Sequence, residues 1–189
     1  MDDMTDMMVD VETTGTAPGS AAIIQLSAVK FNYNTGTIGR VFDRCPMPLP
    51  KRHWDDGTKD FWMGRNREVY NGIVARAEPA IPVFAAFMAF ALDGAPYGGY
   101  RFWSKPLSFD WPMVADHFLQ LDQPMPFHFR IARDVNTWIA ALRGRPEHPD
   151  MEAIVPFHGD RHNGLHDCAY QIDMLFEAKA GNFSEVLEP

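Results

Sequence analysis

The sequence predicts an α/β fold in which a mixed β-sheet is flanked by α-helices. Two observations lead to this class. The N-terminal part of the chain holds three short runs of apolar and β-branched residues, separated by turn residues, which is typical of consecutive antiparallel strands. Farther along, runs with helical spacing of apolar residues alternate with further short strand candidates. The order βββ, helices, β, α, β, α packs helices against the faces of one mixed sheet.

The three N-terminal strands are predicted from residue type and turn chemistry. Residues 7–14 form a short apolar run that stops at Gly15, where turn residues begin. Ile23–Phe31 is rich in β-branched residues and predicts a second strand. Asn34-Thr35-Gly36 marks a hairpin turn, after which Ile38–Cys45 returns as the third strand.

The rest of the chain alternates helices with short strands. We expect two further strands, Tyr97–Trp103 and Arg130–Val135. The predicted helices are Thr58–Ala75, Pro82–Leu92, Met113–Leu121, Asn136–Arg143 and Asn163–Lys179. Arg145–Pro156 contains three prolines and predicts a loop, and the segment after Gly181 should fray.

Length and composition predict one domain over residues 1–189. The 46% hydrophobic content is that of a globular protein. A net charge of −8 argues against non-specific coating of duplex DNA or of an anionic membrane, but metal ions could still hold a nucleic acid at one site. Two cysteines without a CxxC pair, an acidic N-terminus and the lack of an 18-residue apolar run predict a soluble, cytoplasmic protein.

Asp10 and Glu12 are the first candidates for chemistry. Residues two apart in a strand point to the same face of a sheet, so both carboxylates lie together. Two buried like charges repel each other unless a cation sits between them, and hard oxygen ligands suit Mg²⁺ or Mn²⁺. The alternative is an edge strand with two solvated acids.

Two more acids stand at places where function and structure compete. Asp110 lies between the end of a predicted strand and the predicted helix Met113–Leu121, where it is either a functional group or a helix N-cap. Asp167 lies about 140° from the centre of the apolar face of the last helix, by the 100° step of an α-helix. It is therefore turned away from that core face, as either a site residue or a solvated acid.

Three histidines offer a competing metal site. His158, His162 and His166 are spaced by four residues and would line one face of a continuous helix as zinc ligands. Gly159 and Gly164 interrupt such a helix, which disfavours a zinc-binding regulator.

Together these motifs resemble the DEDDh 3′–5′ exonucleases. The resemblance rests on Asp10-x-Glu12, Phe109-Asp110, and His162 followed by Asp167 after four residues, in the order that the family has. It is closer to a small single-domain branch that contains phage exonuclease A and related bacterial exoribonucleases. The phrases Val-Asp-Val-Glu-Thr-Thr-Gly, Ser-Phe-Asp, Arg133-Asp134 and Arg-His-Asn-Gly-Leu-His-Asp carry this closer likeness.

The resemblance spans a core from residue 7 to about 178, and it implies an RNase H-like (DnaQ-like exonuclease) fold with a five-stranded mixed sheet. It implies hydrolysis from the 3′ end of single-stranded nucleic acid to nucleoside 5′-monophosphates, with two Mg²⁺ or Mn²⁺ ions as cofactors. Asp10, Glu12, Asp110 and Asp167 would hold the metals, and His162 would be the general base. The partner would be a single-stranded 3′ end, met by a monomer or homodimer in the cytoplasm, or in the host cytoplasm for a phage protein.

Substrate contacts are predicted at residues near these motifs: Thr13, Thr14, Trp62 and Ser108. Trp62 or Trp103 would stack a base, with core packing as the alternative for both rings. DNA is slightly favoured over RNA by the phage resemblance. The alternatives are an exoribonuclease acting on RNA 3′ ends or overhangs, and a non-catalytic module that binds a nucleic-acid end or a protein.

Overall fold

A computed structural model describes residues 3–146 and 151–183, and these form a single mixed sheet with helices on both faces. The sheet has six strands in the order β4-β3-β2-β1-β5-β6. Their bounds are β1 Asp6–Thr13, β2 Ile23–Asn32, β3 Thr37–Pro46, β4 Ala77–Glu78, β5 Arg101–Ser104 and β6 Ala132–Asp134. Most of the C-terminal segment that was expected to fray, from residue 184 on, lies outside the described residues.

Strand pairing makes β1 the centre of the site. β1 and β2 pair in antiparallel fashion, as do β2 and β3, which confirms the predicted N-terminal meander. On its other side β1 pairs in parallel with β5, but only from Asp6 to Met8. After Met8, β1 therefore has no strand beside it on that edge, and side chains from other elements lie there instead.

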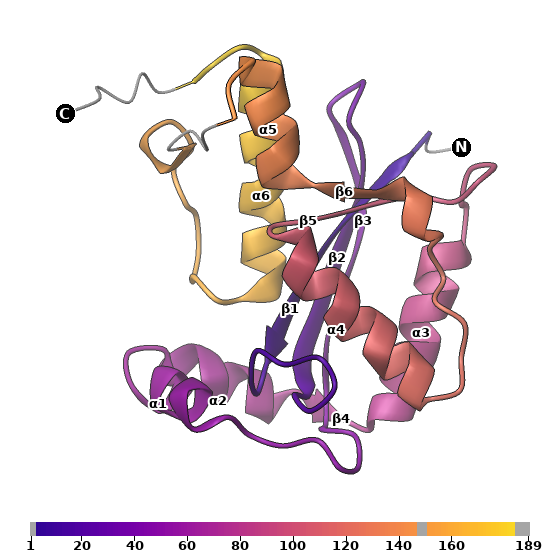
Figure 1. Cartoon of the computed structure of the whole chain (residues 1–189), viewed down its shortest axis with the longest axis vertical. Coiled ribbons are helices and arrows are strands. Elements are labelled where there is room, and N and C mark those ends of the chain that lie inside the picture. The colour runs from indigo at the N-terminus through magenta and orange to yellow at the C-terminus, as the bar shows by residue number, and fades with distance from the viewer. Residues whose placement is uncertain (1–2, 147–150, 184–189) are drawn as a thin grey trace.

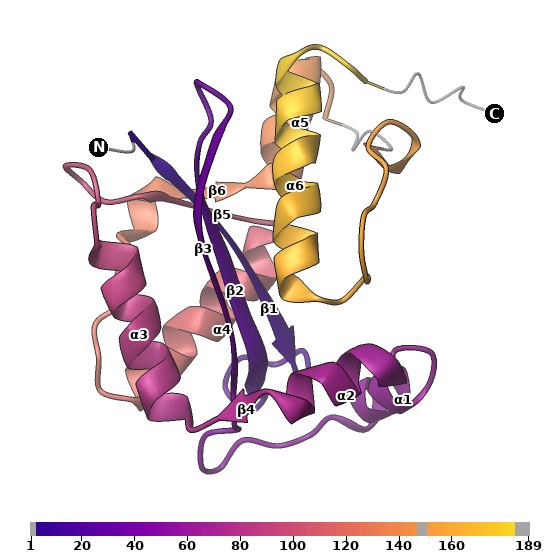
Figure 2. The ribbon, with the colours of Figure 1, turned by 180° about the vertical axis from the view of Figure 1, so that it is seen from behind.

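The helices form two layers and a separate pair at one end of the sheet (Figures 1 and 2). Their bounds are α1 Asp56–Met63, α2 Arg67–Ala75, α3 Ala80–Leu92, α4 Leu107–Gln120, α5 Val135–Arg143 and α6 Gly164–Lys179. α3 and α4 cover one face, α6 covers the other with α5 beside it, and α1 and α2 lie below the start of α6.

The two faces of β1 belong to two apolar cores. Met7, Val9 and Val11 pack with α3 and α4, whereas Met8 packs with α5 and α6. Since side chains alternate along a strand, Asp10 and Glu12 share the α6 side with Met8. The buried β1 thus presents two carboxylates to the start of α6.

Several predicted elements differ from the structure at their ends. The predicted helix Thr58–Ala75 is two helices, separated at Gly64–Asn66. The strand expected from Tyr97 begins only at Arg101, because Gly98 and Gly99 have positive φ and Tyr97 is fully exposed. The two-residue β4, which pairs in parallel with the end of β3, raises the strand count from the expected five to six.

The largest difference concerns the helix that carries Asp110. α4 begins at Leu107 rather than Met113, so Asp110 lies in its first turn and Pro112 inside it. The carboxylate of Asp134 explains the early start, because it accepts a hydrogen bond from the Leu107 N–H at 2.8 Å. A cap supplied by another strand is invisible to local sequence patterns.

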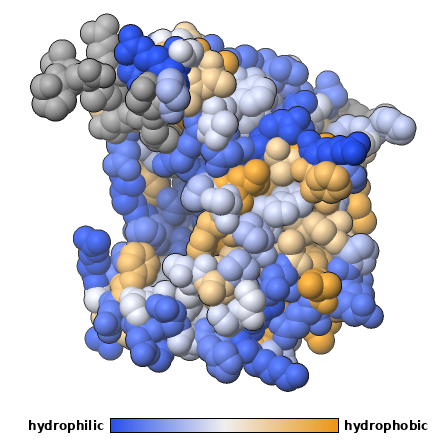
Figure 3. Space-filling model, viewed as in Figure 1, coloured by the Kyte–Doolittle hydropathy of each residue, from blue (hydrophilic) through white to orange (hydrophobic). Residues whose placement is uncertain are grey.

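The space-filling view gives the surface around these elements (Figure 3). Its left side is hollowed between the lobe of α1 and α2 and the column of α6, and hydrophilic residues line much of this hollow. No helix among the described residues is both long and apolar enough to cross a membrane.

Candidate active site

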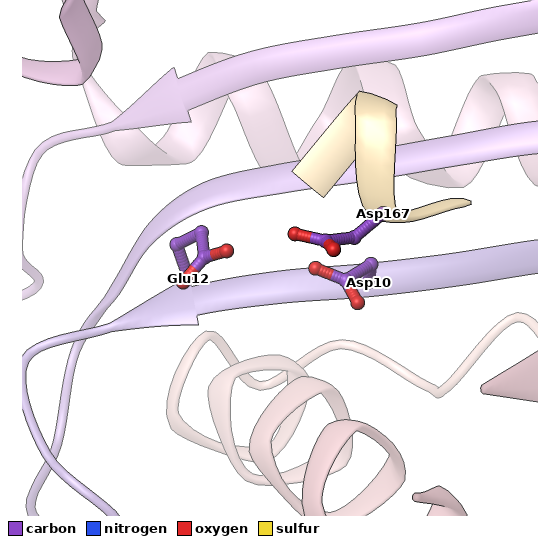
Figure 4. Close-up of side chains that lie close together, drawn as sticks. All are labelled: Asp10, Glu12 and Asp167. Carbon is purple, nitrogen blue, oxygen red and sulfur yellow. The ribbon is translucent and has the colours of Figure 1, made fainter. Parts of the chain in front are cut away.

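Three carboxylates converge where β1 meets α6 (Figure 4). Asp10 and Glu12 come from β1, and Asp167 comes from the first turn of α6. One oxygen atom of each lies within 4.8 Å of the others. Asp10 and Glu12 are 8% and 9% exposed, so the edge-strand alternative with two solvated acids does not describe this strand.

A glycine allows this close approach. Gly164 is the first residue of α6, and a Cβ atom there would lie 2.7 Å from Ser27 Oγ and 3.3 Å from Asp10 Oδ2. The Asn163 side chain caps the helix by accepting a hydrogen bond from the Leu165 N–H at 3.2 Å. The helix terminus is thereby set directly against β1 and β2.

Asp167 is turned away from the apolar face of α6, as the helical spacing predicted, but it faces β1 instead of solvent. It points away from the apolar face of its own helix, but the first turn of α6 lies over β1, so its carboxylate meets Asp10 and Glu12. The side chain is half-buried. The solvated-acid alternative for Asp167 is therefore wrong.

Asp110 joins the same pocket from the opposite layer. It is 2% exposed, and its Oδ1 accepts a hydrogen bond from the Val11 N–H at 3.0 Å. Pro106 is the residue at the cap position of α4, so the N-cap alternative for Asp110 is wrong. A pocket of about 250 Å³ is lined by all four predicted acids, although Asp110 lies outside the group of three within 4.8 Å.

The pKa values of these acids are raised, because the carboxylates are buried close together. Burial, followed by repulsion from Asp110 and Asp167, raises the pKa of Asp10 well above its ordinary value. Burial and the charge of Asp10 do the same to the pKa of Glu12. Burial raises the pKa of Asp110 to about 7 and that of Asp167 to about 6. A bound cation would stabilise the charged form of each carboxylate.

These residues fit a divalent metal ion. Carboxylate oxygens are the hard donors that Mg²⁺ and Mn²⁺ prefer, and the three that converge offer separate oxygens around one position. Among residues 3–146 and 151–183, Asp10, Glu12 and Asp167 form the group of His, Cys, Asp and Glu side chains close enough to hold an ion. The histidines are absent from it, which contradicts the zinc alternative.

His162 lines the acid pocket from the loop before α6. Its backbone has a φ of +63°, which is unusual for a residue with a side chain, and its N–H bonds to the Asp167 carboxylate. The ring meets the Phe61 ring edge-on, with the centroids 4.7 Å apart. Burial and the charges of Arg161 and Arg65 lower the pKa of His162, which favours the neutral imidazole.

The other two predicted zinc ligands lie apart from this arrangement. His158 is exposed, and His166 Nδ1 accepts a hydrogen bond from the Asp160 N–H at 2.9 Å. Since α6 begins only at Gly164, the three histidines do not share a helix face.

The predicted substrate contacts fall outside the acid pocket. Trp62 and Trp103 are each 1% exposed, and their indole N–H groups donate to Thr13 O and Asp6 Oδ1. This corrects the stacking prediction: both rings are core residues with no free face. Ser108 is exposed on α4 and lines a neighbouring pocket of about 600 Å³.

The hydroxyl groups of both threonines bond within the protein. Thr13 Oγ1 donates to Gly15 O, and Thr14 Oγ1 donates to His53 O, each at 2.7 Å. They shape the turn after β1, and nucleotide contact by Thr13 and Thr14 stays a prediction.

Sequence reasoning missed Gln171, which also lines the pocket and donates a hydrogen bond from Nε2 to Asp10 Oδ1 at 2.8 Å. A signal for it existed, because Gln171 lies four residues after Asp167 and so on the same side of α6. Lys105 and Phe109 line the pocket too.

Comparison with solved structures supports the fold. Cell-death related nuclease 4 (CRN-4) superposes with a TM-score of 0.67 and 18% identity, over 94% of this chain and 64% of its own. Exonuclease I superposes with a TM-score of 0.73 and 18% identity, over 94% of this chain and 41% of its own. A zinc-bound complex of E. coli exonuclease I with single-stranded DNA gives 0.68 and 19%, over 93% of this chain and 40% of its own.

The chain thus spans under two thirds of these nucleases, and the likeness confirms the predicted RNase H-like exonuclease fold. No curated protein matches the chain. The model of the 3′–5′ exoribonuclease Rv2179c-like domain matches residues 5–178, nearly the whole chain. The chain therefore belongs to the 3′–5′ exoribonuclease Rv2179c-like family, among the DnaQ-like 3′–5′ exonucleases.

Proposed function

We propose that this domain removes nucleoside 5′-monophosphates one at a time from the 3′ end of a single-stranded nucleic acid. The observation that carries the proposal is the convergence of Asp10, Glu12 and Asp167 within 4.8 Å, with Asp110 and His162 lining the same pocket. These are the five residues that the family motifs require, and they come together from β1, α4, α6 and the loop before α6.

The acids would bind two Mg²⁺ or Mn²⁺ ions. When bound, such ions polarise the scissile phosphate and stabilise the attacking and leaving oxygens. Asp10, Glu12 and Asp167 would hold one ion, and Asp10 with Asp110 would hold the second. A structure of E. coli exonuclease I contains a bound zinc ion, which supports a divalent cofactor in this fold.

His162 is the proposed general base. A base must be neutral to accept a proton, and the lowered pKa of His162 keeps it neutral over most of the physiological range. The Phe61 ring against it limits where the imidazole can move. The unprotonated ring nitrogen of His162 would take the proton of the attacking water.

The pocket favours one unpaired terminal nucleotide. Its volume of about 250 Å³ is small, and the half-buried Phe109 and the Phe61 ring beside His162 offer aromatic surface for a base. Lys105 and Arg161 line the pocket as cations for phosphate. A paired end would first have to separate at a cost of a few kcal/mol.

RNA is the substrate we propose first, since the family is described by its exoribonuclease domain. DNA is the second candidate, because E. coli exonuclease I has been solved with dA16 and dT13 oligonucleotides and the phage resemblance points the same way. A net charge of −8 leaves little capacity for extended contact with duplex phosphates in either case.

The test is a cleavage assay with matched RNA and DNA oligonucleotides, labelled at the 5′ end and incubated with Mg²⁺ or Mn²⁺. We expect ladders that shorten one nucleotide at a time, with 3′ overhangs degraded faster than blunt duplexes. Asp167→Asn should abolish cleavage, whereas Asp173→Asn, an exposed acid on the same helix, should not. Internal cuts, or equal rates on blunt and overhanging ends, would contradict the proposal.

A further inference from the structure

The two polar atoms of the Gln171 side-chain amide differ: one is hydrogen-bonded, and the other is buried without a partner in the part of the chain that the structure describes. The residue is 4% exposed and lines the acid pocket. Its Nε2 donates to Asp10 Oδ1 at 2.8 Å, and its Oε1 is buried without a hydrogen-bond partner among the described residues. A buried acceptor left without a donor is destabilising, so the unpaired Oε1 calls for an explanation.

The orientation of the amide follows from Asp10. The opposite orientation would place Oε1 against an oxygen of the charged carboxylate that a cation requires, and neither atom could donate to the other. Nε2 must therefore face Asp10, and Oε1 must face elsewhere in the pocket wall.

The hydrogen bond also gives the two carboxylate oxygens of Asp10 different neighbours. Oδ1 is held by Gln171, while Oδ2 lies on the side of Gly164, at the start of α6. Asp10 stands between Glu12, Asp167 and Asp110, so its orientation decides how all the acids share a cation. A donor on Oδ1 also favours the charged carboxylate that a cation requires.

We propose that Gln171 is a positioning residue for the metal site: Nε2 fixes the orientation of Asp10, and Oε1 accepts a hydrogen bond from a water molecule carried by the bound divalent cation. This inference rests on the proposed function, because it needs the acids to bind a cation. Hydrated Mg²⁺ and Mn²⁺ keep several waters, and each water brings the donor that Oε1 lacks. Residues that orient a metal ligand in this way contribute 10–100-fold to metal affinity or activity in other sites.

Two variants separate this role from simple packing. Gln171→Leu keeps the approximate volume and removes both polar atoms, whereas Gln171→Glu keeps the acceptor and removes the donor to Asp10. Gln123→Leu, at an exposed position far from the acids, is the control for handling and for surface change.

The experiment measures Mn²⁺ binding without nucleic acid. Two methods monitor it: the thermal unfolding midpoint across a Mn²⁺ titration, and the electron paramagnetic resonance signal of free Mn²⁺. Gln171→Leu should need roughly 10–100-fold more Mn²⁺ for the same stabilisation. In EDTA it should unfold close to the wild-type temperature, since losing the Asp10 bond and losing the orphan acceptor offset each other. Gln171→Glu should unfold earlier in EDTA, through repulsion of Asp10, and gain more from Mn²⁺.

The outcomes distinguish the inference from the function on which it rests. Wild-type Mn²⁺ dependence in both Gln171 variants would overturn the inference and leave the nuclease proposal standing. Mn²⁺ binding with the expected variant shifts, but no cleavage of RNA or DNA, would overturn the nuclease proposal and retain the role of Gln171. A wild-type protein that binds no Mn²⁺ would overturn both.

Discussion

The Val11 N–H donates a hydrogen bond to Asp110 Oδ1 at 3.0 Å, and this bond joins two layers of the fold across 99 residues of sequence. β5 pairs with β1 only as far as Met8, so the edge of β1 near the site has lost its strand partner. The Asp110 side chain takes the place of a strand there. It therefore has a structural task as well as its place beside the acids.

This double task predicts different results for two substitutions of Asp110. Asp110→Asn keeps an oxygen acceptor for Val11 and removes the charge, so it should lose cleavage activity with little loss of stability. Asp110→Ala leaves the Val11 N–H unpaired and should also lower the free energy of unfolding by about 1–3 kcal/mol. Cleavage assays and urea denaturation of both variants check this. Equal stability of the two would show that the bond to Val11 contributes nothing.

His162 predicts a rate effect without a loss of metal binding. His162→Asn should slow cleavage by roughly 10²–10⁴-fold, the usual contribution of a positioned general base. Asn is chosen because it tolerates the positive φ of this position better than Ala does. The wild-type rate should rise with pH through a range below the ordinary histidine value, and the variant should lack that rise. His158→Asn, at an exposed site, is the matched control, and an equal loss there would contradict the assignment.

The raised acid pKa values predict how the metal-free protein responds to pH. Asp110 and Asp167 bind protons more tightly when folded, with pKa values of about 7 and about 6. Their contribution to stability is therefore full below the unfolded pKa and is lost as pH rises through 6 and 7. In EDTA the unfolding temperature should fall by roughly 5 °C or more between pH 5 and 8. Mn²⁺ should remove most of that fall.

His117 acts in the opposite direction, so the comparison needs a variant. Burial lowers the pKa of His117 to about 4, and its contribution to stability is lost as pH falls below the ordinary histidine value. The difference between wild type and Asp110→Asn cancels this effect. That difference should grow as pH rises, and a difference that stays flat would contradict the raised pKa of Asp110.

The aromatic residues predict a separation between stability and substrate binding. Trp62→Phe removes the bond to Thr13 O and should lower the free energy of unfolding by about 1 kcal/mol while KM is unchanged. Phe109→Leu should raise KM by roughly 5–150-fold if the ring stacks on the terminal base. Steady-state kinetics with a short oligonucleotide measure both. A raised KM for Trp62→Phe would contradict this, because it would show that Trp62 contacts the substrate despite its burial.

Local chemistry made part of this molecule predictable. The three N-terminal strands follow from β-branched runs and a hairpin turn, and α6 follows from its cap Asn163 and its apolar spacing. The family motifs named five candidate site residues, and all five line one pocket in the structure.

The remainder depended on contacts between distant segments. α4 starts early because Asp134 caps it from β6, and Pro112 within the helix had suggested a later start. Trp62 is buried because its indole N–H finds a carbonyl on β1, which spacing alone does not reveal. Gln171 went unnoticed because an amide on a helix carries no motif of its own.

The close contact of Gly164 with Asp10 has a consequence for the synthesis of the protein. The acids come from both ends of the described chain, and Asp167 reaches Asp10 only after α6 has emerged from the ribosome and settled on the sheet. At ordinary rates of translation, the interval between the first acids and the last is on the order of ten seconds. During that interval the carboxylates of the proposed cation site are not yet together, so a chain that is still being synthesised carries only part of that site.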